Sequence, residues 1–155
     1  MDAPERRLLA MAVETDWGLY EALPSLRGDT PDASEAEVIA RAGDAVIHLV
    51  SRGLIEMFMH STRAPASMAE EQEVREKMSR GFASEFKGPV AVSVNVPLSP
   101  SEIERVVADP TSWFPSKGRD GRPWYETPHP YFMATVKGER AYREELTDEE
   151  RRGLW

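Results

Sequence analysis

The sequence predicts an α+β fold in which a helical region leads into a small three-stranded antiparallel sheet. A capping box formed by Ser34 and Glu37 opens a helix with one continuous apolar face, predicted over 34–52. Apolar residues then occupy every second position from 90 to 98, which is the period of a half-buried strand. With 155 residues, 41% of them hydrophobic, the chain is long enough for one core. We therefore expect a single domain, 1–155.

The N-terminal part reads as three helices followed by a strand. An apolar stripe predicts a helix over 5–16, and a short second helix over 19–23 is expected to stop near Pro24. Gly53 follows the third helix and is suited to the left-handed conformation that ends a helix. Residues 54–59 then form a largely apolar run, which predicts a buried strand directly after that helix.

The remainder of the chain alternates polar helices with strands and loops. A second capping box predicts a charged helix from 67 onward, and an N-cap followed by proline predicts a short helix over 99–109. Five prolines and several aromatics indicate an irregular loop over 109–130. A strand is expected over 131–136, then a turn at 137–138 and a charged helix or tail. The charged helix carries a narrow apolar stripe formed by Val74, Met78, Phe82 and Phe86.

Charge and composition limit the function classes. The net charge of −8 and pI near 5.0 oppose binding to phosphate backbones at long range. Residues 1–60 carry five arginines against eleven acids, whereas 115–143 carry six basic residues against three acids. No apolar run approaches the roughly 20 residues of a membrane span, and the start lacks the apolar run of a signal peptide. We expect a cytoplasmic protein without membrane contact. The absence of cysteine excludes disulfides and thiolate chemistry.

Two separated segments carry a resemblance to a known family. Residues 53–58, Gly-Leu-Ile-Glu-Met-Phe, and 131–141, Tyr-Phe-Met-Ala-Thr-Val-Lys-Gly-Glu-Arg-Ala, resemble the wing strands of winged-helix (winged helix-turn-helix) regulators. In that family a recognition helix ends in Gly-Leu-Ile or a similar sequence, and the returning strand carries an aromatic, then Thr and Gly, then a helix. The resemblance implies a winged-helix-like domain in which 5–58 supply the helical part and first wing strand, and 131–155 the returning strand and C-terminal helix or tail. The chain departs from the family by a long insertion, 59–130.

The resemblance also implies that the 34–52 helix would enter the DNA major groove. The outward side chains of that helix include three acids and only two arginines, which makes a poor surface for phosphates and base edges. Under the DNA-binding hypothesis, cations of this helix contact the DNA and the basic tip of the long loop acts as the wing. Its candidate residues are Arg41, His48, Arg52, Lys117, Arg119 and Arg122.

Aromatic residues in the long loop are the candidates for a partner or ligand surface. Large aromatics supply contact area at low entropic cost, and irregular loops often carry binding residues, although the alternative for each is a place in the core. The residues concerned are Trp113, Phe114, Trp124 and Tyr125.

The sequence contains no recognisable catalytic or metal-binding motif. The three histidines, His48, His60 and His129, are far apart and lack ligand spacing, and neither a phosphate-binding loop nor a Gly-x-Ser-x-Gly elbow is present. We assign no catalytic residue, metal or cofactor. The expected function is a non-enzymatic cytosolic regulatory or protein-interaction module of winged-helix type. Its partner is another protein or a second copy of the chain. The alternative is a DNA-binding transcriptional regulator, and a small hydrolase or ligand-binding enzyme is a third class with no residue to nominate.

Overall fold

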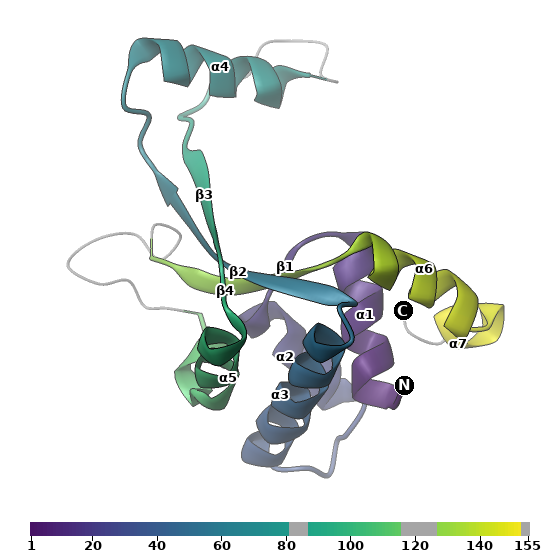
Figure 1. The fold of residues 1–155 in the computed structure, drawn as a ribbon. Helices are drawn as coiled ribbons and strands as arrows, with labels where there is room; N and C mark the ends of the chain where they lie inside the picture. Colours follow the sequence, from purple (N-terminus) through teal and green to yellow (C-terminus); the bar gives the residue numbers. More distant parts are fainter. Residues whose placement is uncertain (81–86, 116–126, 153–155) are drawn as a thin grey trace.

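Three helices occupy the N-terminal third of the chain: α1 (Ala3–Glu14), α2 (Leu19–Gly28) and α3 (Glu35–Ser51). They lie on one side of a sheet in the computed structural model (Figure 1), which describes residues 1–80, 87–115 and 127–152. The Ser34 side chain accepts from the Glu37 backbone N–H at 3.3 Å, and the Glu37 carboxylate accepts from the Ser34 N–H at 2.8 Å, which confirms the predicted capping box.

Helix α2 is longer than the sequence predicts, because Pro24 lies inside it instead of ending it. A proline within a helix removes one backbone hydrogen bond. The neighbours Leu23 and Leu26 are 6% and 4% exposed, so the apolar face on both sides of the proline is packed into the core. Tertiary burial of an apolar face contributes more to helix stability in proteins than local propensity does, which explains why the helix continues.

The sheet has four antiparallel strands, not three: β1 (Trp17–Gly18), β2 (Ile55–Arg63), β3 (Val92–Pro97) and β4 (His129–Ala134). Their order across the sheet is β1-β4-β2-β3. The strand missing from the sequence prediction is β1, whose two residues are too few to show an alternating pattern. It exists because it pairs with residues 131–132 of β4.

Strand β2 pairs with two neighbouring strands, β4 along its first part and β3 along its second part. Residues 55–60 pair with β4, whereas residues 58–63 pair with β3, and so β2 extends four residues beyond its predicted end. The outer part of β2 and β3 forms a two-stranded arm that projects from the helical body and carries α4 (Met68–Ser79) at its tip (Figure 1). Arg63 at the end of β2 donates two hydrogen bonds to the carboxylate of Glu70 in α4.

Helix α4 begins where its N-cap predicts, since the Ser67 hydroxyl accepts from the Glu70 backbone N–H. Within its described range no residue is buried. Of the predicted apolar stripe, Val74 and Met78 lie on α4, and Phe82 and Phe86 fall outside the described residues.

The predicted insertion contributes two further elements that pack against the helices: α5 (Pro100–Ala108) and the 3-10 helix η1 (Pro110–Trp113). After β4 the chain enters α6 (Val136–Glu145) and then α7 (Asp148–Arg152). The turn predicted at 137–138 is wrong, because both residues belong to the first turn of α6.

The core lies between the sheet and helices α1, α2 and α3, and it extends to α5 and η1. Its largest fully buried side chains, each less than 2% exposed, are Trp113, Phe132, Leu8, Leu9, Leu19, Leu49, Leu54, Ile55 and Val46. Residues from 8 to 141 share this one apolar cluster.

Candidate functional site

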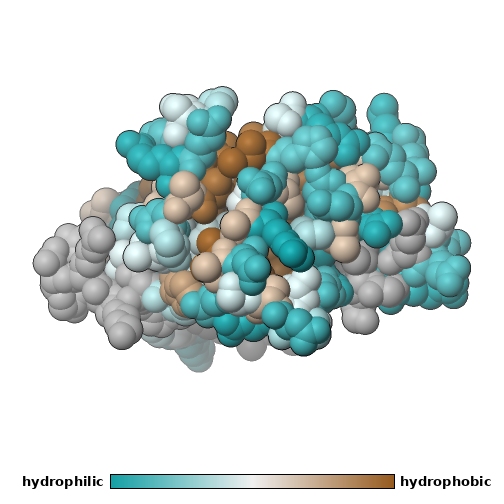
Figure 2. Space-filling view, turned by 90° about the horizontal axis from the view of Figure 1, so that it is seen from below, coloured by the Kyte–Doolittle hydropathy of each residue, from teal (hydrophilic) through white to brown (hydrophobic). Residues whose placement is uncertain are grey.

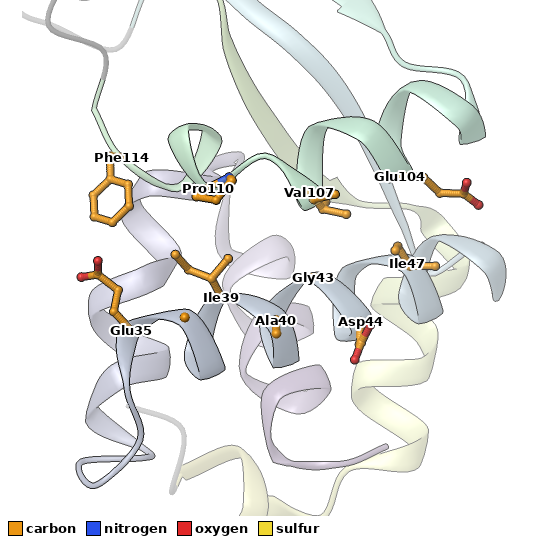
Figure 3. A pocket seen from close by; sticks show the side chains of 12 residues that line it. Glu35, Ile39, Ala40, Gly43, Asp44, Ile47, Glu104, Val107, Pro110 and Phe114 are labelled. Carbon is orange, nitrogen blue, oxygen red and sulfur yellow. The ribbon is translucent and has the colours of Figure 1, made fainter.

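A groove of about 460 Å³ runs between α3 and the α5–η1 segment (Figure 3). One wall comes from α3, and the other comes from α5, η1 and Phe114. The residues that line it are Glu35, Ala36, Ile39, Ala40, Gly43, Asp44, Ile47, Glu104, Val107, Ala108, Pro110 and Phe114. Most of them are apolar. Seen from the helical side of the molecule, hydrophobic surface gathers in a hollow flanked by hydrophilic side chains (Figure 2).

Small residues on α3 let α5 approach closely at the middle of the groove. A Cβ atom placed on Gly43 would lie 3.6 Å from the Val107 carbonyl oxygen, so the two helices are in contact there. Ala36 and Ala40 continue the same face of α3 at helical spacing. These short side chains leave open the space into which Ile39, Ile47 and Phe114 project, as the close-up shows for the labelled residues (Figure 3).

Trp113 fixes the second wall of the groove from behind. Its side chain is fully buried, and the indole Nε1–H donates to the carbonyl oxygen of Val107 at 3.0 Å. Trp113 therefore belongs to the core and not to an exposed partner surface, which corrects the sequence interpretation for this residue. Its neighbour Phe114 does lie at the surface, 39% exposed, and lines the groove. The other two candidates, Trp124 and Tyr125, lie outside the described residues.

The rim of the groove is acidic. Asp44 on α3 and Glu104 on α5 are both exposed, and Glu35 lies at the end nearest Phe114 (Figure 3). Glu35 forms an ion pair with Arg27 at 2.7 Å. Within the described part of the chain, neither lysine nor arginine lines the groove, and Asp44 and Glu104 form no ion pair. The rim therefore presents negative charge on both walls.

The cations proposed for DNA contact on α3 do not line this groove. His48 bonds through Nδ1 to Glu5 of α1, and the Arg52 guanidinium donates to both carboxylate oxygens of Glu145 in α6, at 3.0 and 3.1 Å. Arg41 is exposed and lies beside residues of α1 and α2. The basic loop candidates Lys117, Arg119 and Arg122 fall outside the described residues.

Glu5 is a buried carboxylate, 5% exposed. Burial raises its pKa, but hydrogen bonds from His48 and from the backbone N–H of Asp2 oppose that effect, and its net pKa lies below the usual value. The lowered pKa favours the charged carboxylate in the folded protein, and His48 is the side chain that stabilises this charge. This role leaves Nδ1 of His48 engaged within the protein.

A second cluster lies on the sheet, on the face formed by alternate residues of β2, β3 and β4. His60 pairs with His129 across the strands and bonds through Nδ1 to the Asn95 amide oxygen at 2.7 Å. The Tyr131 ring lies 4.8 Å from the His60 ring, and its hydroxyl is 3.2 Å from that of Tyr20. Burial lowers the pKa of His129, and the charge of His60 lowers it further, despite an opposing hydrogen bond to the Thr127 backbone. These effects favour the neutral form of His129, and the cluster is an aromatic network that joins α2 to the sheet.

Of the groove residues, sequence reasoning nominated only Phe114 as part of a binding surface, although a signal for the α3 residues was present. Ala36, Ala40 and Gly43 recur at spacings of four and three, and Ile47 lies outside the main apolar stripe of the helix. A helix with apolar or small residues on a second face is expected to meet another element there. The sequence did not indicate which element that would be.

Among the described residues, no group of three or more His, Asp or Glu could hold a metal ion. No helix in the described ranges combines the length and apolar character that a bilayer span requires. Comparison with family models, curated proteins and solved structures found no match to this chain.

Proposed function

We propose that this chain is a non-enzymatic protein-interaction module of the winged-helix type, in which the helix that would read DNA binds a protein instead. The observation that carries the proposal is the position of α5, which lies along the outward side of α3 and encloses an apolar groove with an acidic rim. A surface of this character is suited to apolar side chains of a partner and not to a phosphate backbone.

The winged-helix assignment is supported by how the two resembling segments meet. Strands β2 and β4, which carry them, pair antiparallel over six residues each. Gly53 has a φ of 67°, as the helix-ending glycine of the first segment requires. In the second segment, the Thr135 hydroxyl accepts from the Gly138 N–H at 3.0 Å and donates to the Gly53 carbonyl oxygen at 2.7 Å. The Thr and Gly of the resemblance therefore join the two segments.

The charge of α3 argues against DNA as the partner. Carboxylates of Glu35 and Asp44 on its outward side would repel phosphates, and each charge repulsion weakens binding at every sequence. Arg52, one of the two arginines nominated on this helix, already forms an ion pair with Glu145 in which one guanidinium nitrogen contacts both carboxylate oxygens. Using this arginine for DNA would require breaking that pair.

The test is fluorescence anisotropy of a labelled mixed-sequence DNA duplex, titrated with the protein at about 50 mM and about 200 mM salt. We expect no saturable binding at either concentration, and the same result for Arg41→Ala and Arg52→Ala. Binding that collapses at the higher salt and weakens in either variant would replace this proposal with the DNA-binding regulator.

A further inference from the structure

We infer that the groove between α3 and α5 binds a cationic amphipathic helix, about three turns long, from a partner protein. This inference rests on the proposed function and names the kind of partner. It follows from the length of the groove, its apolar lining and the charge of its rim.

The length of the groove follows from the α3 residues along it. Its lining on this helix runs from Glu35 to Ile47, which are twelve residues apart. At about 1.5 Å per residue this distance corresponds to roughly 18 Å, which is the length of about three helical turns. A single aromatic side chain would leave most of the groove empty.

The apolar lining suits one face of a helix. Ile47 is 36% and Phe114 is 39% exposed, which is high for side chains of this size, and the groove places apolar residues at both of its ends (Figure 3). A helix that docks in a groove presents apolar anchors at positions i, i+3 or i+4, and i+7. Such a stripe would cover Ile39 between the two ends.

The acidic rim selects the charge of the partner. Asp44 stands on one wall and Glu104 on the other, so lysines or arginines on both sides of the partner's apolar stripe would each lie near a carboxylate. Complementary rim charges increase the association rate and reject partners of the wrong sign. A second copy of this chain is a poor occupant, because it brings a net charge of −8 to an acidic surface.

The experiment is a selection from a displayed library of 15-residue peptides with helical apolar patterning and random flanking residues, using the full chain as bait. The enriched sequences are then synthesised, labelled and titrated in anisotropy measurements. We expect enrichment of Lys and Arg beside the apolar stripe, and we expect affinity to fall with increasing salt.

Two groove variants test the location of binding. Ala40 is exposed and lines the groove, so Ala40→Trp should fill it without disturbing the core. The double variant Asp44→Lys with Glu104→Lys reverses the rim charge. We expect each variant to weaken binding of the selected peptide at least tenfold.

The matched controls are placed on exposed positions away from the groove. Ala69→Trp adds the same side chain on α4, and the double variant Glu76→Lys with Glu144→Lys changes the net charge by the same amount on α4 and α6. Both controls should bind as the parent protein does.

Three results would overturn the inference: no enriched peptide, enrichment of acidic or unpatterned peptides, or unchanged affinity in Ala40→Trp. Circular dichroism of each variant establishes that the fold is intact. These three results concern peptide binding alone. Failure of the proposed function would instead appear in the duplex titration, as DNA binding that weakens with salt. The two failures are therefore distinguishable.

Discussion

Thr135 and Gly138 connect the start of α6 to the turn between α3 and β2. The backbone N–H of Thr135 donates to the Leu54 carbonyl oxygen at 3.0 Å, and its hydroxyl donates to the Gly53 carbonyl oxygen at 2.7 Å. Lys137 adds a hydrogen bond from Nζ to the carbonyl oxygen of Arg52 at 2.6 Å. Residues 81 or more positions apart in sequence are thus held together by backbone acceptors at one point.

We predict that Gly138→Ala strongly destabilises the protein. A Cβ atom at this position would lie 1.9 Å from the Leu54 carbonyl oxygen, so the backbone must move and the hydrogen bonds of Thr135 with it. A loss of about 2–4 kcal/mol in the free energy of unfolding is expected. Urea denaturation measures it, with Gly28→Ala as control, because a Cβ there meets no atom within 4 Å. Equal stability of the two variants would contradict the close approach.

We also predict that His48→Ala destabilises the protein at neutral pH and that this loss shrinks in acid. The variant removes the main hydrogen bond that lowers the pKa of Glu5, and the buried carboxylate is left poorly satisfied. The expected cost at pH 7 is about 1–3 kcal/mol. Because the pKa of Glu5 is lower in the folded than in the unfolded state, its contribution is present above the unfolded pKa, near 4.5, and is lost as pH falls through the folded pKa.

The measurement is urea denaturation of the parent, His48→Ala, Glu5→Gln and the double variant between pH 7 and pH 3. The cost of His48→Ala should be largest at pH 7 and should shrink as the pH falls toward 3, because the parent loses the contribution of Glu5 in acid. In the Glu5→Gln background the same substitution should cost much less, because the interaction is already absent. Additive losses in the double variant would show that the two side chains are not coupled.

At the scale of elements, α3 is packed on two faces. One face joins α1, α2 and the sheet, and the other meets α5 through Gly43. Helix α4, by contrast, has no buried residue within its described range. It is joined to the arm by the hydrogen bonds between Arg63 and Glu70. These bonds hold the pKa of Glu70 at about 2, with the Ala66 backbone N–H contributing, so α4 keeps this attachment through the physiological pH range.

We predict that Gly43→Ala stabilises the protein. Gly43 lies inside α3, where glycine costs roughly 0.5–1 kcal/mol relative to alanine. The added methyl group would lie at 3.6–3.9 Å from Val107, which is ordinary van der Waals contact. Urea denaturation should therefore show a gain of about 0.5–1 kcal/mol. A loss of stability would mean that α5 lies closer to α3 than described, and Gly43→Leu provides the comparison in which a loss is expected.

At the scale of the whole molecule, part of the predicted insertion is integral to the core. Trp113 belongs to η1 and is fully buried among core residues, and η1 contacts α2 as well as α3. We predict that Trp113→Ala costs about 3–5 kcal/mol, because it creates a cavity and removes the hydrogen bond to Val107.

Thermal and urea denaturation test this prediction, with Phe114→Ala as the matched control. Phe114 is an aromatic neighbour at the groove and is 39% exposed, so its loss should cost far less. If both variants are equally stable, the α5–η1 segment is a peripheral addition and the groove lacks a firm second wall.

The sequence by itself determined the local features of this protein, whereas the tertiary structure decided its surfaces. Capping at Ser34, the left-handed Gly53 and the alternation of β3 depend on nearest neighbours along the chain, and each was predicted close to its observed place. The two-residue strand β1, the continuation of α2 through Pro24 and the burial of Trp113 depend on partners far away in sequence. The groove also depends on residues that are far apart in sequence. Its two walls are separated by more than fifty residues, and only the folding of α5 onto α3 brings their apolar and acidic side chains together.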